Sequence, residues 1–294
     1  MRSQRIAVRF SFFCLWGASL LAQTTIGGGT CSSASVNGAY AVSITGRQVN
    51  ASGAFTSVFQ AGGTATFDGL SKVTIALTAD TNQAVATQLT WSGTYSMQAN
   101  CVGVVNIATG GSATFSIELY SVLGGNAPNF VLVGNDATYS YTGNGNTQPA
   151  SGCAAAPLSG VYTFNATGFV LNGASVGGVE DGAGLLQFDG QGHLTVNVTL
   201  YVTGTATTTL TLTGSYSLAS NCLGSATLTD SSSNSYVMSL SVNSATKLYS
   251  SNVLVALARS SKFIMLGNAH AIYNQPTATA LSILPAAGLW GGRA

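Results

Sequence analysis

The sequence predicts an all-β protein of two tandem, antiparallel, up-and-down β-barrel modules with about eight strands each, the alternative being β-sandwich modules. Three observations predict this class: an internal repeat, alternation of apolar and polar residues in both copies, and tight-turn signals between the alternating segments. We find no helical periodicity beyond the N-terminal segment.

The repeat is clearest at residues 93–103, GTYSMQANCVG, which return at 214–224 as GSYSLASNCLG. Six of these eleven positions are identical, with the cysteine in register. The other landmarks keep the same order at an offset of 121 or 122 residues: Cys31 with Cys153, Gly38-Ala39-Tyr40 with Gly160-Val161-Tyr162, and Phe67-Asp68-Gly69 with Phe188-Asp189-Gly190. The order predicts a duplicated domain, with one module over 31–142 and the other over 153–273.

Strands are predicted by alternation with a period of two, as in residues 194–203 and 210–218 of the second copy. Asp-Gly pairs at 68–69 and 189–190 suit tight hairpins that need positive φ. In the first copy the predicted strands are 38–46, 54–67, 72–79, 84–97, 102–109, 112–122, 129–135 and 137–142, with a matching series over 160–273.

The segments outside the modules have distinct compositions. Residues 1–22 carry three arginines and then an apolar run, which is typical of a secretory signal peptide and too short for a transmembrane helix. Residues 143–152, rich in Gly and Asn, are predicted to be a flexible linker, and residues 274–294 a flexible tail. We therefore expect a secreted, periplasmic or extracellular protein with no transmembrane helix.

Charge argues against several classes of partner. After residue 22 the chain keeps six basic and eight acidic residues, a formal charge of −2. No basic patch is available to neutralise phosphates, so we expect no nucleic acid partner. The oligomeric state is left open.

Four cysteines remain after the signal segment, and four cysteines allow three pairings. The repeat favours Cys31 with Cys101 and Cys153 with Cys222, because each pair brings the start of a module to the turn between its fourth and fifth strands. An immunoglobulin-like sandwich would place a tyrosine two residues before the second cysteine. Ala99 and Ser220 occupy those positions. An outer-membrane barrel of about sixteen strands fits the alternation and low charge but not the disulfides and the predicted linker.

No catalytic, metal or cofactor site is predicted. His193 follows a hairpin turn and His270 lies in the last strand, but no nucleophile motif accompanies either histidine. Glu118 is expected to face solvent from a strand whose apolar face is Phe115, Ile117 and Leu119. Glu180-Asp181 is interpreted as a solvated acidic loop, and no charged or histidine side chain is expected inside a barrel.

Seven aromatic residues recur at equivalent places in the two copies or lie beside them. The leading interpretation is that they pack the cores, and the second is that they line a pocket for a small apolar molecule. These candidate pocket-lining residues are Tyr40, Phe67, Trp91, Tyr95, Tyr162, Phe188 and Tyr216.

The order G-x-Y, F-D-G-x-G, G-x-Y-S and N-C-x-G resembles a group of exported bacterial proteins with calycin-like barrels. The residues that carry it are Gly38 and Tyr40, 67–69, 93–96 and 100–103, with their second copies. The first copy departs from it at Leu70-Ser71, where the second copy keeps Gly192. The G-x-Y is similar to the G-x-W of lipocalins, and the general shape is similar to allene-oxide-cyclase-like barrels. The resemblance implies ligand binding or isomerase-like chemistry and transfers no active-site residue.

Three functions follow as hypotheses. The first is a non-catalytic exported protein that binds a small apolar molecule, which an interior cavity would favour. The second is a structural or adhesive surface protein, which packed interiors and exposed apolar patches would favour. The third is a barrel enzyme of cyclase type, which needs a charged or histidine side chain inside a barrel.

Overall fold

The computed structural model describes residues 30–82, 87–120, 128–148, 153, 158–204, 207–243 and 253–272. The predicted signal peptide and the predicted tail lie outside these ranges. Within them the chain forms a short 3-10 helix, η2 (Ser33–Val36), and sixteen strands. None of the helices in this part of the chain is long and apolar enough to cross a membrane.

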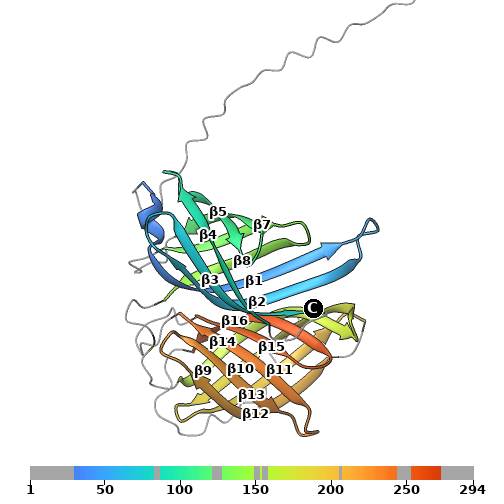
Figure 1. Cartoon of the computed structure of the whole chain (residues 1–294). Coiled ribbons are helices and arrows are strands. Elements are labelled where there is room, and N and C mark those ends of the chain that lie inside the picture. The colour runs from blue at the N-terminus through green and yellow to red at the C-terminus, as the bar shows by residue number, and fades with distance from the viewer. Residues whose placement is uncertain are drawn as a thin grey trace, which may run out of the picture.

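The strands form two closed, up-and-down antiparallel barrels, which confirms the predicted fold class (Figure 1). Barrel 1 contains β1 (Gly38–Val49), β2 (Phe55–Phe67), β3 (Lys72–Thr81), β4 (Thr87–Met97), β5 (Val102–Thr109), β6 (Thr114–Tyr120), β7 (Asn129–Asn135) and β8 (Ser140–Thr147). Barrel 2 contains β9 (Ser159–Asn172), β10 (Ser175–Asp189), β11 (His193–Val202), β12 (Thr208–Leu218), β13 (Leu223–Thr229), β14 (Ser235–Val242), β15 (Val253–Arg259) and β16 (Phe263–Ala271).

Each barrel closes by pairing its first strand with its last. In barrel 1, Gly46 of β1 pairs with Phe59 of β2 and also with Tyr141 of β8. In barrel 2, Gly168 of β9 pairs with Glu180 of β10 and with Met265 of β16. The pairs correspond one to one, so the two barrels share one register.

Alternation along the strands places one face in each barrel interior. In β6, Phe115, Ile117 and Leu119 are buried, whereas Glu118 between them is exposed. The sequence prediction that Glu118 faces solvent is therefore correct, because side chains of a strand alternate between its two faces.

The predicted linker is shorter than expected, because residues 143–147 belong to β8. Gly143 and Gly145 face the barrel interior, where larger neighbours occupy the space of a side chain. A Cβ on Gly145 would lie 2.1 Å from Cζ of Phe130. The glycines that suggested flexibility are thus required by packing, and barrel 1 extends past residue 142, where the sequence had placed its end.

Both predicted disulfides are present, Cys31–Cys101 and Cys153–Cys222. They indicate an oxidising compartment outside the cytoplasm. Each bridge joins the start of a barrel to the turn between its fourth and fifth strands. In that turn Cys101 and Cys222 adopt left-handed φ values of 68° and 65°.

In each barrel a tyrosine of the repeat forms a hydrogen bond to the segment before the first strand, at the end that carries the disulfide. The Tyr95 hydroxyl donates to the Ser33 carbonyl oxygen over 2.9 Å, and the Tyr216 hydroxyl donates to the Leu158 carbonyl oxygen. The repeated G-x-Y-S and N-C-x-G motifs therefore act together as a structural clasp.

The barrels lie side by side, with β1 and β2 of barrel 1 against β16 and neighbouring strands of barrel 2 (Figure 1). Outward-facing side chains near the middle of these strands, such as Val58 and Gln60, are consequently buried, and Ala41 contacts Leu266. The Gln60 Nε2 donates to the Thr167 carbonyl oxygen over 3.0 Å, and the Ser241 Oγ donates to the Gly63 carbonyl oxygen over 2.7 Å.

Candidate functional site

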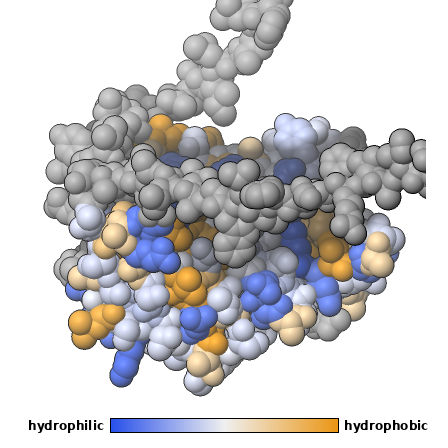
Figure 2. All heavy atoms as spheres, turned by 90° about the horizontal axis from the view of Figure 1, so that it is seen from above, coloured by the Kyte–Doolittle hydropathy of each residue, from blue (hydrophilic) through white to orange (hydrophobic). Residues whose placement is uncertain are grey.

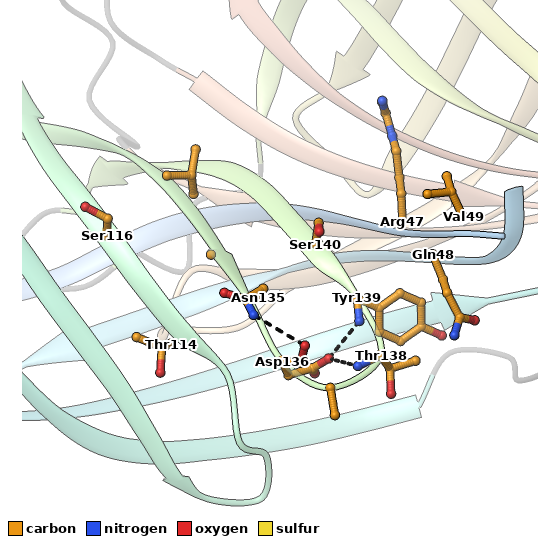
Figure 3. Close-up of a pocket in the computed structure, with 13 residues that line it drawn as sticks. Arg47, Gln48, Val49, Thr114, Ser116, Asn135, Asp136, Thr138, Tyr139 and Ser140 are labelled. Atoms are coloured by element: carbon orange, nitrogen blue, oxygen red, sulfur yellow. Dashed lines mark hydrogen bonds between the residues drawn. The ribbon is translucent and has the colours of Figure 1, made fainter. Parts of the chain in front are cut away.

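An open groove of about 820 Å³ lies on the outside of barrel 1 (Figure 3). It crosses β6, β7, β8 and the end of β1. Its lining residues are Arg47, Gln48, Val49, Thr114, Ser116, Val133, Gly134, Asn135, Asp136, Ala137, Thr138, Tyr139 and Ser140.

Both charged side chains of this groove already have structural contacts. The Arg47 guanidinium lies 5.8 Å from the Phe55 ring and 5.9 Å from the Phe169 ring, where cation–π attraction stabilises the contact between barrels. The Asp136 carboxylate accepts the backbone N–H groups of Thr138 and Tyr139 at 2.6 and 2.7 Å (Figure 3). Asp136 therefore stabilises the turn before β8, and the groove contains no buried polar group that awaits a ligand.

The interior of barrel 1 is packed. At one end, opposite the disulfide, Phe59 stacks on Trp91 with ring centroids 6.0 Å apart and meets Tyr141 edge-on at 5.6 Å. Phe115 lies 6.1 Å from Trp91. The remaining void is about 10 Å³, which is at the lower limit for one water molecule. We call this group of rings the aromatic plug.

Barrel 2 has smaller residues at the same register positions. Glu180 replaces Phe59, Leu212 replaces Trp91, Met238 replaces Phe115 and Met265 replaces Tyr141, as the matching strand pairs show. An apolar cavity of about 40 Å³ remains among Phe164, Ala166, Val196, Val198, Leu200, Leu210, Leu212, Leu228, Tyr236, Val237, Met238, Phe263 and Met265. Loss of the aromatic plug thus leaves free volume inside barrel 2.

Glu180 does not itself line this cavity, but it lies on β10 close to residues that contact the cavity wall. The inward-facing positions of β10 continue from Glu180 through Gly182 to Leu186. A Cβ on Gly182 would lie 3.0 Å from Met265 Cε and 3.2 Å from Leu200 Cδ2, and both of those residues line the cavity. The carboxyl is therefore one inward-facing position away from the cavity wall.

The carboxyl of Glu180 is buried without full compensation. The residue is 4% exposed, and its Oε2 has no hydrogen-bond partner among the described residues. Burial raises the pKa of the Glu180 carboxyl to about 7, because a charged carboxylate is costly to remove from water. The interpretation of Glu180-Asp181 as a solvated loop was wrong, because both residues belong to β10. Asp181 is exposed, but Glu180 is buried, so a titratable group does lie inside a barrel.

Tyr236 lies on the opposite wall of barrel 2, and the charge of Glu180 affects the pKa of its hydroxyl. Burial, the hydrogen bond to Asp230 and the charges of Asp230 and Glu180 raise the pKa of Tyr236 to about 12. The Tyr236 hydroxyl donates to Asp230 Oδ2 over 3.0 Å. The Tyr236 hydroxyl therefore donates its hydrogen bond to a turn residue and not to the Glu180 carboxyl.

The residues singled out from sequence lie elsewhere. The seven candidate pocket-lining aromatic residues are all buried in the two cores, and none of those in barrel 2 lines its cavity. His193 is exposed and its Nδ1 lies 2.7 Å from Asp189 Oδ2, and His270 is exposed on β16. Among the described residues no cluster of His, Cys, Asp or Glu could hold a metal ion.

Sequence reasoning missed Glu180, although a signal for its direction existed. Phe188 and Leu186 set the inward phase of β10, and counting back by twos reaches Glu180. Gly182 and Gly184 occupy the intervening inward positions and carry no side chain, which hid the alternation.

Fold and interior together define a tandem-barrel protein with one packed barrel and one barrel that contains an apolar cavity beside a buried carboxyl. Comparison with protein-family models and with curated proteins found no match.

Proposed function

We propose that the protein is exported and non-catalytic, and that it binds a small, mainly apolar molecule inside barrel 2, with barrel 1 as a packed structural partner. The observation that carries this proposal is the difference between two barrels of one register. Barrel 1 fills the half away from its disulfide with the aromatic plug, whereas barrel 2 keeps an apolar cavity of about 40 Å³ among the residues that replace those rings. The signal-like N-terminus and the resemblance to exported calycin-like proteins support the same assignment.

The side chains around the cavity can change conformation to admit a small ligand. The cavity is smaller than the roughly 150 Å³ of an engineered core cavity that holds benzene. A ligand therefore requires side chains to move, and Met238 and Met265 line the cavity. Methionine has three rotatable bonds and fills irregular spaces, so it yields to a ligand at low cost.

An enzymatic role has less support. Glu180 is the titratable carboxyl near the cavity, and a mechanism that uses both an acid and a base would need a second side chain within reach of the reacting atoms. The Tyr236 hydroxyl is bonded to Asp230, and both histidines are on the outer surface.

A structural or adhesive role has one favourable observation, the exposed valines of β7. Val131 and Val133 are 46% and 56% exposed. The coloured part of the face seen in Figure 2 mixes hydrophobic and hydrophilic residues. Contiguous apolar area marks interaction surfaces, and two exposed valines supply little of it, so small-molecule binding is the better proposal.

The test uses the methionine methyl groups as local reporters. Protein labelled with ¹³C at the methionine methyls is titrated with benzene and followed by NMR. We expect the signals of Met238 and Met265 to shift saturably, whereas Met97 of barrel 1 stays unchanged. Absence of saturable shifts at Met238 and Met265 would contradict the proposal.

Two variants make the test specific. Leu212→Phe moves the cavity wall towards the Trp91 arrangement of barrel 1 and should weaken benzene binding at least tenfold, since it fills the space that benzene takes. Leu185→Phe makes the same change on the outer face of β10 and should bind benzene like the unmodified protein. Equal affinities of all three proteins would refute binding in the cavity.

A further inference from the structure

Glu180 occupies a position where the same fold uses an aromatic ring. In barrel 1 the equivalent Phe59 contacts Trp91 and Tyr141 and completes the packed end. In barrel 2 an acidic side chain of similar reach stands beside an apolar cavity. Glu180 lacks the ring packing that Phe59 provides in barrel 1, and its Oε2 forms no hydrogen bond that would compensate for this loss.

No described side chain forms an ion pair with this carboxyl. The ion pair described in barrel 2 joins His193 and Asp189 at the opposite end of the barrel. Tyr236 directs its hydroxyl to Asp230, which itself carries negative charge. Buried acidic groups are normally paired, so the unpartnered oxygen of Glu180 is an acceptor without a donor.

We infer that Glu180 is the polar anchor of the barrel 2 site and that the preferred ligand is a small apolar molecule that carries an ammonium group. This inference rests on the proposed function. An ammonium group brings a positive charge and three N–H donors to the unpartnered oxygen, while the rest of the molecule occupies the apolar cavity. A neutral hydrocarbon leaves the acceptor unsatisfied, and an anion is repelled by it.

The test compares three probes that share a six-membered ring: cyclohexylamine, cyclohexanol and methylcyclohexane. Binding is followed at the Met238 and Met265 methyl signals at pH 8, where the carboxyl is ionised and an alkylamine with a pKa of about 10 is still protonated. We expect cyclohexylamine to bind at least tenfold more tightly than methylcyclohexane, in line with a charge-assisted hydrogen bond.

Glu180→Gln keeps the shape of the side chain and removes its charge. In this variant the preference for the amine should fall at least tenfold, while the affinity for methylcyclohexane stays the same or rises. Asp181→Asn, which removes the adjacent outward-facing carboxyl, should leave the preference unchanged and so controls for net charge. In the probe-free variants, an unchanged Met97 signal and dispersed signals of Met238 and Met265 like those of the unmodified protein verify that each variant folds.

The outcomes separate the two proposals. If none of the probes shifts the signals of Met238 and Met265, the proposed function fails. If methylcyclohexane or cyclohexanol binds but the amine gains no advantage, only the role of Glu180 is overturned. The same conclusion follows if Glu180→Gln retains the full amine preference.

Discussion

The buried carboxyl of Glu180 should make the stability of barrel 2 fall as pH rises from about 4.5 to about 7. Burial raises its pKa from 4.5 to about 7, so the folded chain binds this proton more tightly than the unfolded chain does. Below this range both states are protonated and burial of the neutral acid costs little. Above it both states are ionised, and the folded state contains a buried charge.

The magnitude follows from the linkage between proton binding and folding. One pKa unit corresponds to about 1.4 kcal/mol, so this group should lower the free energy of unfolding by about 3 kcal/mol across the window. Tyr236, which lines the cavity, and its hydrogen-bond partner Asp230 have pKa values raised to about 12 and lowered to about 2, respectively. Both therefore keep their charge state throughout the window.

The assay is urea unfolding at a series of pH values between 4 and 8, followed by the methyl signal of Met265 as a reporter of barrel 2. Glu180→Gln should lose this part of the pH dependence and be more stable than the unmodified protein at pH 8 by up to about 3 kcal/mol. Asp181→Asn should keep the original slope. A Glu180→Gln profile parallel to that of the unmodified protein would refute the reasoning.

Three further results are expected from urea unfolding of variants. Phe59→Ala should destabilise barrel 1 by about 3–5 kcal/mol because it empties the aromatic plug, whereas Leu70→Ala at an exposed turn should stay within about 0.5 kcal/mol; equal effects would contradict a packed interior. Replacing Cys31 and Cys101 together by Ser should cost about 4 kcal/mol, and a bridge between barrels in non-reducing peptide maps would contradict the pairing. Asn82→Ala removes the 2.8 Å hydrogen bond from Nδ2 to the Ala174 carbonyl and should cost about 1–3 kcal/mol, with faster amide exchange at the contact between barrels; unchanged exchange would contradict that contact.

The strands and disulfides were predictable because local chemistry determines them. Residues 114–120 alternate between apolar and polar side chains, and β6 follows that pattern to the residue. The repeated Asn-Cys turn placed Cys101 and Cys222 in equivalent positions, which set the pairing. Each of these inferences depends on side chains that face one side of one strand or turn.

The parts that could not be predicted depend on distant neighbours. Residues 143–147 looked like a linker because their glycines carry no sign of the Phe130 ring that fills the space beside Gly145. Nothing in the sequence marks Gln60 as buried, because barrel 2 covers it only in the assembled chain. Glu180 was misplaced for the related reason that the neighbouring inward positions of β10 are glycines.

The central claim is that two barrels of one register differ in their interiors, with a cavity of about 40 Å³ in barrel 2 and a void of about 10 Å³ in barrel 1. A crystal structure of the full exported chain under xenon pressure tests this most directly, because xenon occupies apolar cavities without needing specific polar contacts. We predict a xenon site among Leu212, Met238 and Met265 and none among Phe59, Trp91 and Phe115. Xenon in barrel 1, or an empty barrel 2 at the same pressure, would contradict the account.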